Sequence, residues 1–297
     1  MGETLLLVDA YSLIYRAFYA IRVLTGPGGE PVNAIFGFTK MLRKLLAEHR
    51  PSHAAVVFDL GPPTVRLALL PSYKAQRPPT PPDLERQVPA IRDMIPALGL
   101  ALIEAEGQEA DDLIATLAVR FADAGGDVLI ASTDKDFMQL VGPRLRLVRS
   151  DGKETKLVDA AAVQARYGVP PEQIVDLLSL TGDAVDNIRG VPGVGEKTAA
   201  DLLGKYQTLD NLLAHASDIP KPKLRDALLA HTAQLHVNRV LIALRCDLEL
   251  PLDRESLRVQ SPDYPALLAL TERFGFKSFR AELEKERTAS ADLFDGR

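Results

Sequence analysis

The sequence has little of several features that would point to other kinds of protein. Cys246 is the only cysteine among 297 residues, so the chain can form neither an internal disulfide nor a zinc site built on cysteines. The five histidines show no metal-ligand spacing beside the acidic residues. No apolar run approaches the ~20 residues of a membrane-spanning helix. A signal-peptide pattern is missing, and Leu6 stands where myristoylation requires Ser or Thr. These absences favour a soluble enzyme in the cytoplasm, without a membrane partner.

What the sequence does have is nine acidic residues at the ends of apolar runs or in short acidic motifs. They stand in the segments LLLVDA, VVFD, EADD, STDKD and TGDAVDN. The nine are Asp9, Asp59, Glu109, Asp111, Asp112, Asp134, Asp136, Asp183 and Asp186. Carboxylates gathered in one place repel each other, and hard cations such as Mg²⁺ relieve the repulsion while leaving room for a substrate phosphate. The pattern therefore predicts a metal-dependent enzyme that cuts phosphodiester bonds.

Several of these acids lie where parallel strands would bring them together. Apolar runs at residues 5–8, 54–58 and 128–131 lead into acids, and such runs are typical of strands buried on both faces. In open α/β sheets, ligands bind outside the carboxyl ends of the strands. The acids of EADD and of TGDAVDN, taken alone, also fit helix-capping or solvated residues. Taken with the strand ends, they favour one shared metal site.

The chain shows two kinds of organisation. Up to about residue 165, expected strands (4–8, 54–58, 100–103, 128–131, 145–148) alternate with expected helices (34–48, 83–97, 110–124, 135–141). This alternation predicts an α/β domain over residues 1–165, with a mainly parallel central sheet flanked by helices. Residues 166–288 have a helical pattern, and the small, polar residues 289–297 are expected to form a flexible tail.

Residues 60–82 form a long connection punctuated by prolines. Arg66, Tyr73, Lys74 and Arg77 lie between these prolines. Cations with an aromatic between them could grip phosphates and stack a base of a single strand, and a solvated basic loop is the alternative. The net charge of −5 does not exclude a DNA substrate, because the nine clustered acids exceed it and leave a mildly basic remainder.

A glycine-rich segment, GVPGVGEKTAA from Gly190, leads directly into a helical pattern. Backbone N–H groups at such a helix start bind phosphate without reading bases. Gly193 and Gly195 would let a DNA backbone approach closely, and Arg189 and Lys197 add positive charge. Glu196 breaks the Walker pattern, in which lysine follows glycine directly. A helix–hairpin–helix clamp for duplex DNA is the better interpretation.

Together these segments resemble the 5′-nuclease family, which contains the 5′→3′ exonuclease domains of bacterial DNA polymerase I and the flap endonucleases. The resemblance runs from about residue 5 to about residue 250 and is carried by VDAYSLIYRAFYA, NAIFGFTKML, YKAQRPPTP, EADDLIATLA, STDKDFMQLV and GDAVDNIRGVPGVGEKTAADLL. It implies a PIN-like nuclease core with a helix–three-turn–helix DNA-binding region. It also implies that the nine acids surround two or three Mg²⁺ or Mn²⁺ ions. The implied activity is 5′→3′ exonuclease and 5′-flap endonuclease cleavage of branched or nicked DNA during replication and repair.

The resemblance implies roles for further residues. Arg16 would contact the 5′ phosphate region, while Lys74 and Arg77 would lie in an arch, or gateway, that admits the 5′ strand and stabilises the scissile phosphate. Arg66 is expected to contact DNA, and Tyr73 to stack on an unpaired base. Gly193, Val194 and Gly195 would form a hairpin that holds K⁺ against the duplex backbone.

The expected chemistry is two-metal hydrolysis that leaves a 5′ phosphate, with the ions ~4 Å apart. Asp9, Asp59 and Asp111 are assigned to one ion, and Asp136, Asp183 and Asp186 to the other. Asp134 and Glu109 are expected to lie between the two ions, and Asp112 to act through water.

Two alternatives stay open at this point. One is a non-catalytic DNA-structure-binding protein that uses the hairpin clamp alone, and the other is an RNase H-like nuclease that removes primers from RNA–DNA hybrids. Few residues follow residue 250, so the chain is expected to be either a stand-alone nuclease, which we favour, or an excised domain. We also expect a monomer, with a DNA polymerase as a possible partner. Asp292, Leu293 and Phe294 resemble the end of a sliding-clamp-binding motif, although Ser290 replaces its glutamine; the alternative is a tail folded onto the domain.

Overall fold

The computed structural model describes residues 2–150 and 155–295, and the chain forms two compact units. Unit 1 contains Met1–Phe58, Pro79–Ile103 and Leu250–Arg297, and unit 2 contains Asp59–Pro78 and Glu104–Glu249. Neither unit is one continuous stretch of sequence. The expected domain boundary near residue 165 therefore stays a prediction.

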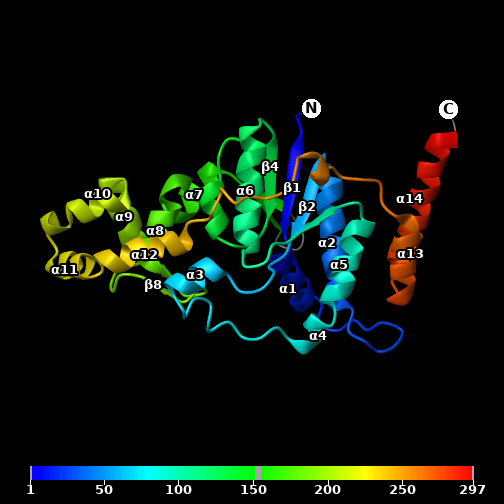
Figure 1. Cartoon of the computed structure of the whole chain (residues 1–297), viewed down its shortest axis with the longest axis horizontal. Coiled ribbons are helices and arrows are strands. Elements are labelled where there is room, and N and C mark those ends of the chain that lie inside the picture. Colours follow the sequence, from blue (N-terminus) through cyan, green and yellow to red (C-terminus); the bar gives the residue numbers. More distant parts are fainter. Residues whose placement is uncertain (1, 151–154, 296–297) are drawn as a thin grey trace. The chain divides into compact units, whose positions relative to one another are not determined.

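Unit 1 is built on three parallel strands, β1 (Thr4–Asp9), β2 (His53–Val57) and β3 (Ala101–Ile103), with β2 between the other two (Figure 1). Leu5 pairs with His53, and Ala55 pairs with Ala101. All of β2 and nearly all of β1 is buried, as expected for parallel strands covered on both faces. The apolar runs in the sequence therefore place these strands to within one residue.

The helices of unit 1 are α1 (Ala10–Ala20), α2 (Asn33–His49), α4 (Pro82–Glu85), α5 (Val88–Ala97), η4 (Glu255–Leu257), α13 (Tyr264–Arg273) and α14 (Lys277–Asp295). A close approach of α1 and α2 depends on Gly37, because a Cβ at this position would lie 2.9 Å from the Cβ of Ala17. The single helix predicted at 83–97 is wrong, since the chain breaks between α4 and α5. At that break Gln87 turns its side-chain oxygen to the start of α2, where it accepts hydrogen bonds from the N–H groups of Ala34 (2.8 Å) and Ile35 (3.3 Å).

The backbone of α14 continues through the segment that was predicted to be a flexible tail from residue 289. The side chains of Asp292, Leu293 and Phe294 lie outside the described residues, so their clamp-binding role stays a prediction.

The strands of unit 2 are β4 (Asp127–Ala131), β5 (Leu145–Ser150), β6 (Thr155–Val158), β7 (Gly182–Asp183) and β8 (Ile188–Arg189). β4 and β5 are parallel, β6 is antiparallel to β5, and β7 forms a small hairpin with β8. The sequence did not predict β6, in which a polar residue opens the strand and lysine follows it. The central part of β4 is fully buried and leads into STDKD.

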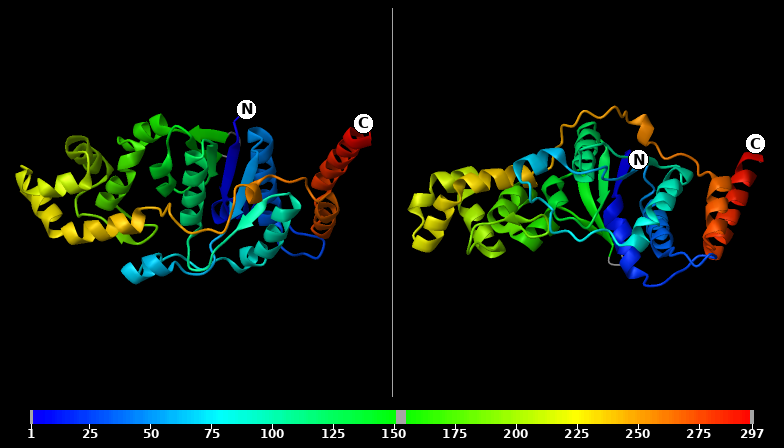
Figure 2. Two further views of the ribbon diagram at one scale, coloured as in Figure 1. Left: turned by 45° about the horizontal axis from the view of Figure 1, so that its top comes forward. Right: turned by 60° about the horizontal axis from the view of Figure 1, so that its bottom comes forward.

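The helices of unit 2 are α3 (Thr64–Leu69), α6 (Ala110–Asp123), η1 (Asp136–Leu140), α7 (Ala160–Tyr167), η2 (Pro171–Gln173), α8 (Ile174–Thr181), α9 (Glu196–Tyr206), α10 (Leu209–Ala214), η3 (Ala216–Asp218), α11 (Pro222–Ala230) and α12 (Thr232–Ile242). Figures 1 and 2 show α8 to α12 as one helical group. α3 lies inside the proline-rich connection, where no helix was predicted. Within the part of the chain that the structure describes, no helix is long and apolar enough to span a membrane.

Candidate metal centre

The hairpin formed by β7 and β8 carries two of the predicted metal acids. Gly182 has a φ of +77°, and a Cβ on it would lie 2.3 Å from the backbone nitrogen of Gly190. A Cβ on Gly190 would lie 2.2 Å from the backbone of Thr181. Only glycine fits these two positions, and the resulting turn buries both Asp183 and Asp186.

A second turn, after β4, carries Asp134 and Asp136. The Asp134 N–H donates to the hydroxyl oxygen of Ser132 (3.0 Å), and the Asp136 N–H donates to the Asp134 carboxylate (2.9 Å). Asp134 therefore shapes the turn that presents Asp136 at the start of η1.

Three carboxylates from these two turns converge. Asp136, Asp183 and Asp186 each offer one oxygen, and these oxygens lie within 4.8 Å of one another. The Oδ1 atom of Asp136 is buried without a hydrogen-bond partner among the described residues. Burial, followed by the charges of Asp134, Asp183 and Asp186, raises the pKa of Asp136 well above its ordinary value. An unpartnered buried oxygen within a set of hard oxygen donors fits a divalent cation such as Mg²⁺ or Mn²⁺.

One lysine lies against this cluster. The Nζ of Lys135 is 2.9 Å from Asp183. Burial alone would lower the pKa of Lys135, but the hydrogen bond to Asp183 and the charges of Asp183, Asp136 and Asp134 raise it. Lys135 therefore stays charged and offsets part of the acidic charge. The sequence already showed Lys135 between two acids, but it was not predicted as a site residue.

The acids around the start of α6 make a different set of contacts. Asp59 accepts a hydrogen bond from the N–H of Ala110 (2.9 Å), which fixes Asp59 beside the first turn of α6. Glu109 and Asp112 are buried, and both pair with Arg66. Both oxygens of Asp112 bond to Arg66, at 2.6 and 2.9 Å. Asp112 anchors Arg66 in this structure, and its metal role stays a prediction.

Arg66 itself is buried, and its role as a DNA contact stays a prediction. Its guanidinium also donates to the carbonyl oxygens of Leu241 (2.8 Å) and Ala243 (3.2 Å). Burial would lower the pKa of Arg66, but the hydrogen bond to Asp112 and the charges of Glu109 and Asp112 raise it. With its donors bound inside the protein, Arg66 links α3 to the end of α12 and the residue that follows it.

Residues 72–77, which we call the gateway turn, place three more side chains on the acids. Lys74 pairs with Glu109 and lies 3.9 Å from Asp186, while Arg77 lies 2.7 Å from Asp186. Burial would lower the pKa values of both cations, but the nearby carboxylates, Glu109 first for Lys74 and Asp186 first for Arg77, raise them. Two positive charges therefore border the carboxylate cluster.

Tyr73 does not have the exposed ring that its predicted base stacking requires. Its side chain is only 5% exposed, and its hydroxyl donates to Asp186 at 2.9 Å and to Glu109 at 3.3 Å. Burial, followed by the charges of Glu109 and Asp186, raises the pKa of the Tyr73 phenol. Tyr73 therefore remains a neutral donor that orients Asp186, and its base stacking stays a prediction.

Two predicted site residues, Asp9 and Arg16, belong to unit 1. Asp9 ends β1 and caps α1, where its carboxylate accepts a hydrogen bond from the N–H of Ser12 (3.1 Å). Its side chain is buried at the carboxyl end of the strand, as the sequence predicted. The participation of Asp9 and Arg16 in the same site stays a prediction.

The predicted duplex clamp lies between β8 and α9. Gly193 has a φ of +81°, and nothing lies within 4 Å of a Cβ built on Gly193 or on Gly195. Arg189 and Lys197 are exposed, whereas the side chain of Val194 is buried. The hairpin therefore presents open glycine backbone at the start of α9, with Val194 as its internal anchor.

Two amides that sequence reasoning missed hold the β7–β8 hairpin in place. Asn238 in α12 is buried and donates to the carbonyl oxygens of Ser179 (3.0 Å) and Arg189 (2.8 Å). Gln234 donates to the same Arg189 oxygen at 2.7 Å. Nothing in the sequence connects α12 to the acids, because about 50 residues separate Asn238 from its partners.

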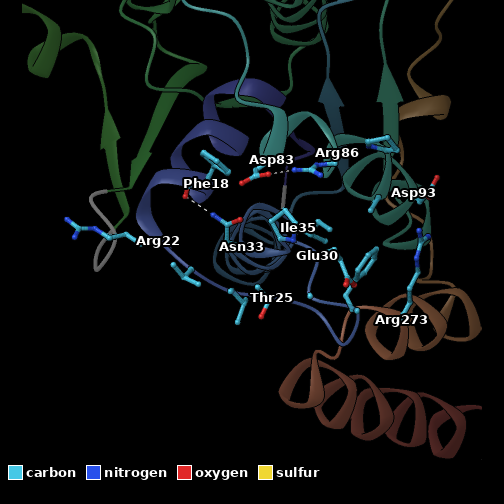
Figure 3. Close-up of a pocket in the computed structure, with 18 residues that line it drawn as sticks. Phe18, Arg22, Thr25, Glu30, Asn33, Ile35, Asp83, Arg86, Asp93 and Arg273 are labelled. Atoms are coloured by element: carbon cyan, nitrogen blue, oxygen red, sulfur yellow. Dashed lines mark hydrogen bonds and ion pairs between the residues drawn. The ribbon is translucent and has the colours of Figure 1, made fainter.

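Unit 1 has a pocket of its own, of about 850 Å³ (Figure 3). The close-up shows the amide of Asn33 directed at the carbonyl oxygen of Phe18 and the ion pair between Asp83 and Arg86. None of the predicted site residues lines this pocket.

Comparisons with known proteins place this geometry in a family. A model described as "5'-3' exonuclease, N-terminal resolvase-like domain" matches residues 4–168, and one described as "5'-3' exonuclease, C-terminal SAM fold" matches residues 169–265. A 5'-3' exonuclease of Aquifex aeolicus is 36% identical over 287 residues, which cover 95% of this chain and 96% of that protein.

DNA polymerase I of Bacillus caldotenax is 39% identical over 286 residues, or 96% of this chain and 33% of the polymerase. The corresponding enzyme of Rhizobium leguminosarum is 41% identical over 93% of this chain and 28% of the polymerase. The chain thus spans about a third of the length of these relatives.

Two solved structures have the same fold. The D15 protein of phage T5, co-crystallised with metal ions, matches with a TM-score of 0.67 at 20% identity, over 95% of this chain and 99% of that chain. The catalytic core of Rad2 in complex with DNA substrate matches with a TM-score of 0.64 at 18% identity, over 95% and 93%. With the family models, these matches confirm the predicted fold class, a mostly parallel sheet with flanking helices and a helical C-terminal region.

Proposed function

The chain belongs to the 5′-3′ exonuclease family, and on that premise we propose that it hydrolyses DNA as a metal-dependent 5′→3′ exonuclease and 5′-flap endonuclease. One observation carries the proposal: Asp136, Asp183 and Asp186 converge beside the cations of the gateway turn. A purely DNA-binding protein has no need for three mutually repelling carboxylates, two of them buried and one half-buried.

These residues would hold a divalent cation, Mg²⁺ or Mn²⁺. When bound, the cation would polarise the scissile phosphate and ease ionisation of the attacking water. Asp59 and Asp111 are proposed for a second ion, because Asp59 is fixed one residue away from Asp111 by the Ala110 N–H. Asp9, at the end of β1, is also proposed as a metal ligand. Asp134 and Glu109 are proposed to support the two groups of acids. Asp134 shapes the turn that presents Asp136, and Glu109 contacts the gateway turn through Lys74.

The protein's own side chains contribute to charge and to orientation. Lys74 and Arg77 bring positive charge to Asp186 and can counter the negative charge that develops on the phosphate in the transition state. Tyr73 fixes the orientation of Asp186, and Lys135 offsets part of the negative charge around Asp183. Arg16 is proposed to contact the 5′ phosphate end of the substrate.

The glycine hairpin between β8 and α9 is proposed to hold duplex DNA through its backbone. Open N–H groups at the start of a helix of 11 residues bind phosphate without reading bases. Arg189 and Lys197 add exposed positive charge on either side, and a K⁺ ion would fit the same phosphate contact.

Further partners are proposed for the same site and for the C-terminus. RNA–DNA hybrids share the phosphate backbone that the clamp would recognise, and a DNA polymerase would produce the flaps. The segment Asp292–Phe294 is proposed to bind a sliding clamp; deletion of residues 292–297 should then abolish binding to a bacterial sliding clamp, and undiminished binding would remove the idea.

The experiment is a cleavage assay on matched 5′-flap, nicked, blunt and RNA–DNA hybrid substrates with Mg²⁺, with Mn²⁺ and with a chelator. We expect metal-dependent cleavage that is strongest on the 5′-flap and nicked substrates. Asp183→Asn should abolish cleavage, whereas Asp226→Asn, the same change at an exposed aspartate of α11, should not. Cleavage that persists in chelator, or that Asp183→Asn leaves intact, would overturn the proposal.

A further inference from the structure

Two turns that are distant in sequence are hydrogen-bonded to each other next to the carboxylate cluster. One is the gateway turn, and the other is residues 184–187, which we call the hairpin turn. The side-chain amide of Asn187 donates to the carbonyl oxygen of Ser72 (2.8 Å), and the N–H of Lys74 donates to the carbonyl oxygen of Asp186 (3.1 Å). The side-chain amide of Gln76 donates to the carbonyl oxygen of Ala184. These bonds join the backbone of the turn that carries the cations to that of the turn that carries Asp186.

Both turns have an unusual backbone conformation at the point where they meet. Lys74 has a φ of +55° and Asn187 a φ of +60°, in the left-handed region that side chains other than glycine and asparagine rarely adopt. Such conformations persist only where the surrounding contacts determine them. Lys74 is held by its own N–H bond to Asp186, and Asn187 contributes its side chain to the opposite turn.

The backbone of the gateway turn decides where its functional groups lie. Tyr73 and Lys74 are consecutive residues, and their side chains reach Asp186 and Glu109. Ser72, which immediately precedes them, receives the Asn187 amide. Asn187 makes this side-chain bond to a backbone carbonyl and not to a carboxylate, so it affects the cluster through the gateway turn.

We propose that Asn187 is a positioning residue whose amide fixes the gateway turn, so that Lys74 remains on Asp186 and Glu109. The effect on cleavage rests on the proposed function, whereas the effect on the turn does not. Neither the resemblance nor the acidic pattern assigned a role to Asn187.

Asn187→Gly removes the side chain while keeping the backbone conformation, because glycine adopts a positive φ without strain. Gln207→Gly is a matched control: Gln207 has a φ of +68°, and its side-chain amide donates to the carbonyl oxygen of Gly204 at 2.8 Å, at the end of α9. Both variants remove one amide hydrogen bond from one left-handed residue, and only Asn187 touches the gateway turn.

The first measurement is amide hydrogen exchange of residues 72–77 in the full chain, without metal or DNA. Asn187→Gly should speed exchange of the Lys74 amide about tenfold, because the hydrogen bond from Asn187 to Ser72 keeps that amide on the carbonyl oxygen of Asp186. Gln207→Gly should leave the same amide unchanged. Equal exchange in the wild type and in Asn187→Gly would overturn the proposal, whatever the protein cleaves.

The second measurement is single-turnover cleavage of a 5′-flap substrate together with its dissociation constant. Asn187→Gly should slow cleavage about tenfold and leave DNA affinity within twofold. In a Lys74→Ala background, adding Asn187→Gly should slow cleavage little further, because the hydrogen bond from Asn187 to Ser72 affects cleavage through Lys74.

The possible failures are distinguishable. Additive penalties in the double variant would mean a merely structural role and overturn positioning. If the Lys74 amide exchanges faster in Asn187→Gly while Lys74→Ala cleaves at the wild-type rate, the effect of Asn187 on the gateway turn is supported. Lys74 is then removed from the proposed mechanism.

Discussion

At the scale of single residues, the cations of unit 2 divide into buried anchors and site groups. Arg66 is buried with protein partners on every side, whereas the Arg77 side chain is 47% exposed. Sequence could place both in one basic loop but could not tell which guanidinium would be buried. Burial depends on the carbonyls of Leu241 and Ala243, which lie far along the chain.

The first prediction is that Arg66→Met destabilises the protein by about 3–5 kcal/mol. Removing one partner of a buried ion pair leaves Glu109 and Asp112 as uncompensated buried charges. Urea unfolding of the metal-free protein measures the change. Arg77→Met, at the partly exposed cation, should cost less than about 1 kcal/mol. A similar small cost for Arg66→Met would show that Arg66 is not an anchor.

The second prediction concerns His53, which is completely buried at the start of β2 and whose Nδ1 lies 2.9 Å from the hydroxyl of Ser52. Burial is the main cause that lowers the pKa of His53 below 6.5; Arg254 and Arg258 also lower it, and Glu3 and Glu255 oppose them. The unfolded chain then binds a proton at a higher pH than the folded protein does. Stability should therefore fall as the pH drops below 6.5.

Unfolding by urea over a pH series tests this sign. The loss of stability on acidification should be smaller in His53→Gln, which cannot titrate. An identical pH dependence in the two proteins would rule His53 out as its source.

At the scale of elements, the β7–β8 hairpin depends on two glycines, and this gives the third prediction. Gly190→Ala should destabilise the protein by several kcal/mol, because the added Cβ would lie 2.2 Å from the backbone of Thr181. Gly195→Ala, where the Cβ meets nothing within 4 Å, should change thermal stability little. Equal melting temperatures for the two variants would contradict this account of the hairpin.

The strands β1 to β5 could be predicted from sequence because each is largely a short apolar run that needs no distant partner to be recognised, whereas β6, β7 and β8 lack such a run. Elements that depend on distant contacts could not be predicted. At the break before α5, Gln87 accepts hydrogen bonds from the start of α2, and α3 is held by Arg66 bonding to the end of α12. The acids Asp183 and Asp186, proposed as metal ligands, were found as a motif, but Asn187 and Asn238, which bond to the backbone around their hairpin, carry no signal of their own.

At the scale of the whole molecule, the family match confirms the predicted resemblance, and the proposed DNA substrate has to be reconciled with an acidic chain. The net charge is −5, and the nine acids of the proposed site carry more negative charge than this, so the rest of the chain is mildly basic. Binding should then depend on local basic groups and not on the total charge.

The fourth prediction separates binding from chemistry. Lys197→Ala should weaken duplex binding and lower the salt slope by about one unit, because Lys197 is exposed at the clamp. Lys74→Ala should instead slow single-turnover cleavage, because Lys74 lies on the carboxylates. Salt-dependent binding and single-turnover rates, measured on both variants, distinguish the roles. A pure affinity defect in Lys74→Ala would leave it as a strand contact only.

The most direct test of the central claim is single-turnover cleavage of a 5′-flap substrate by Asp136→Asn at saturating Mg²⁺. Asp136 has the unpartnered buried oxygen of the cluster, so its loss should remove a metal ligand with little change elsewhere. The account predicts a rate lower by about a thousandfold or more, which corresponds to several kcal/mol, with DNA affinity within a small factor of the wild type. A near-normal rate in this variant would contradict the assignment of Asp136, Asp183 and Asp186 as the catalytic metal site.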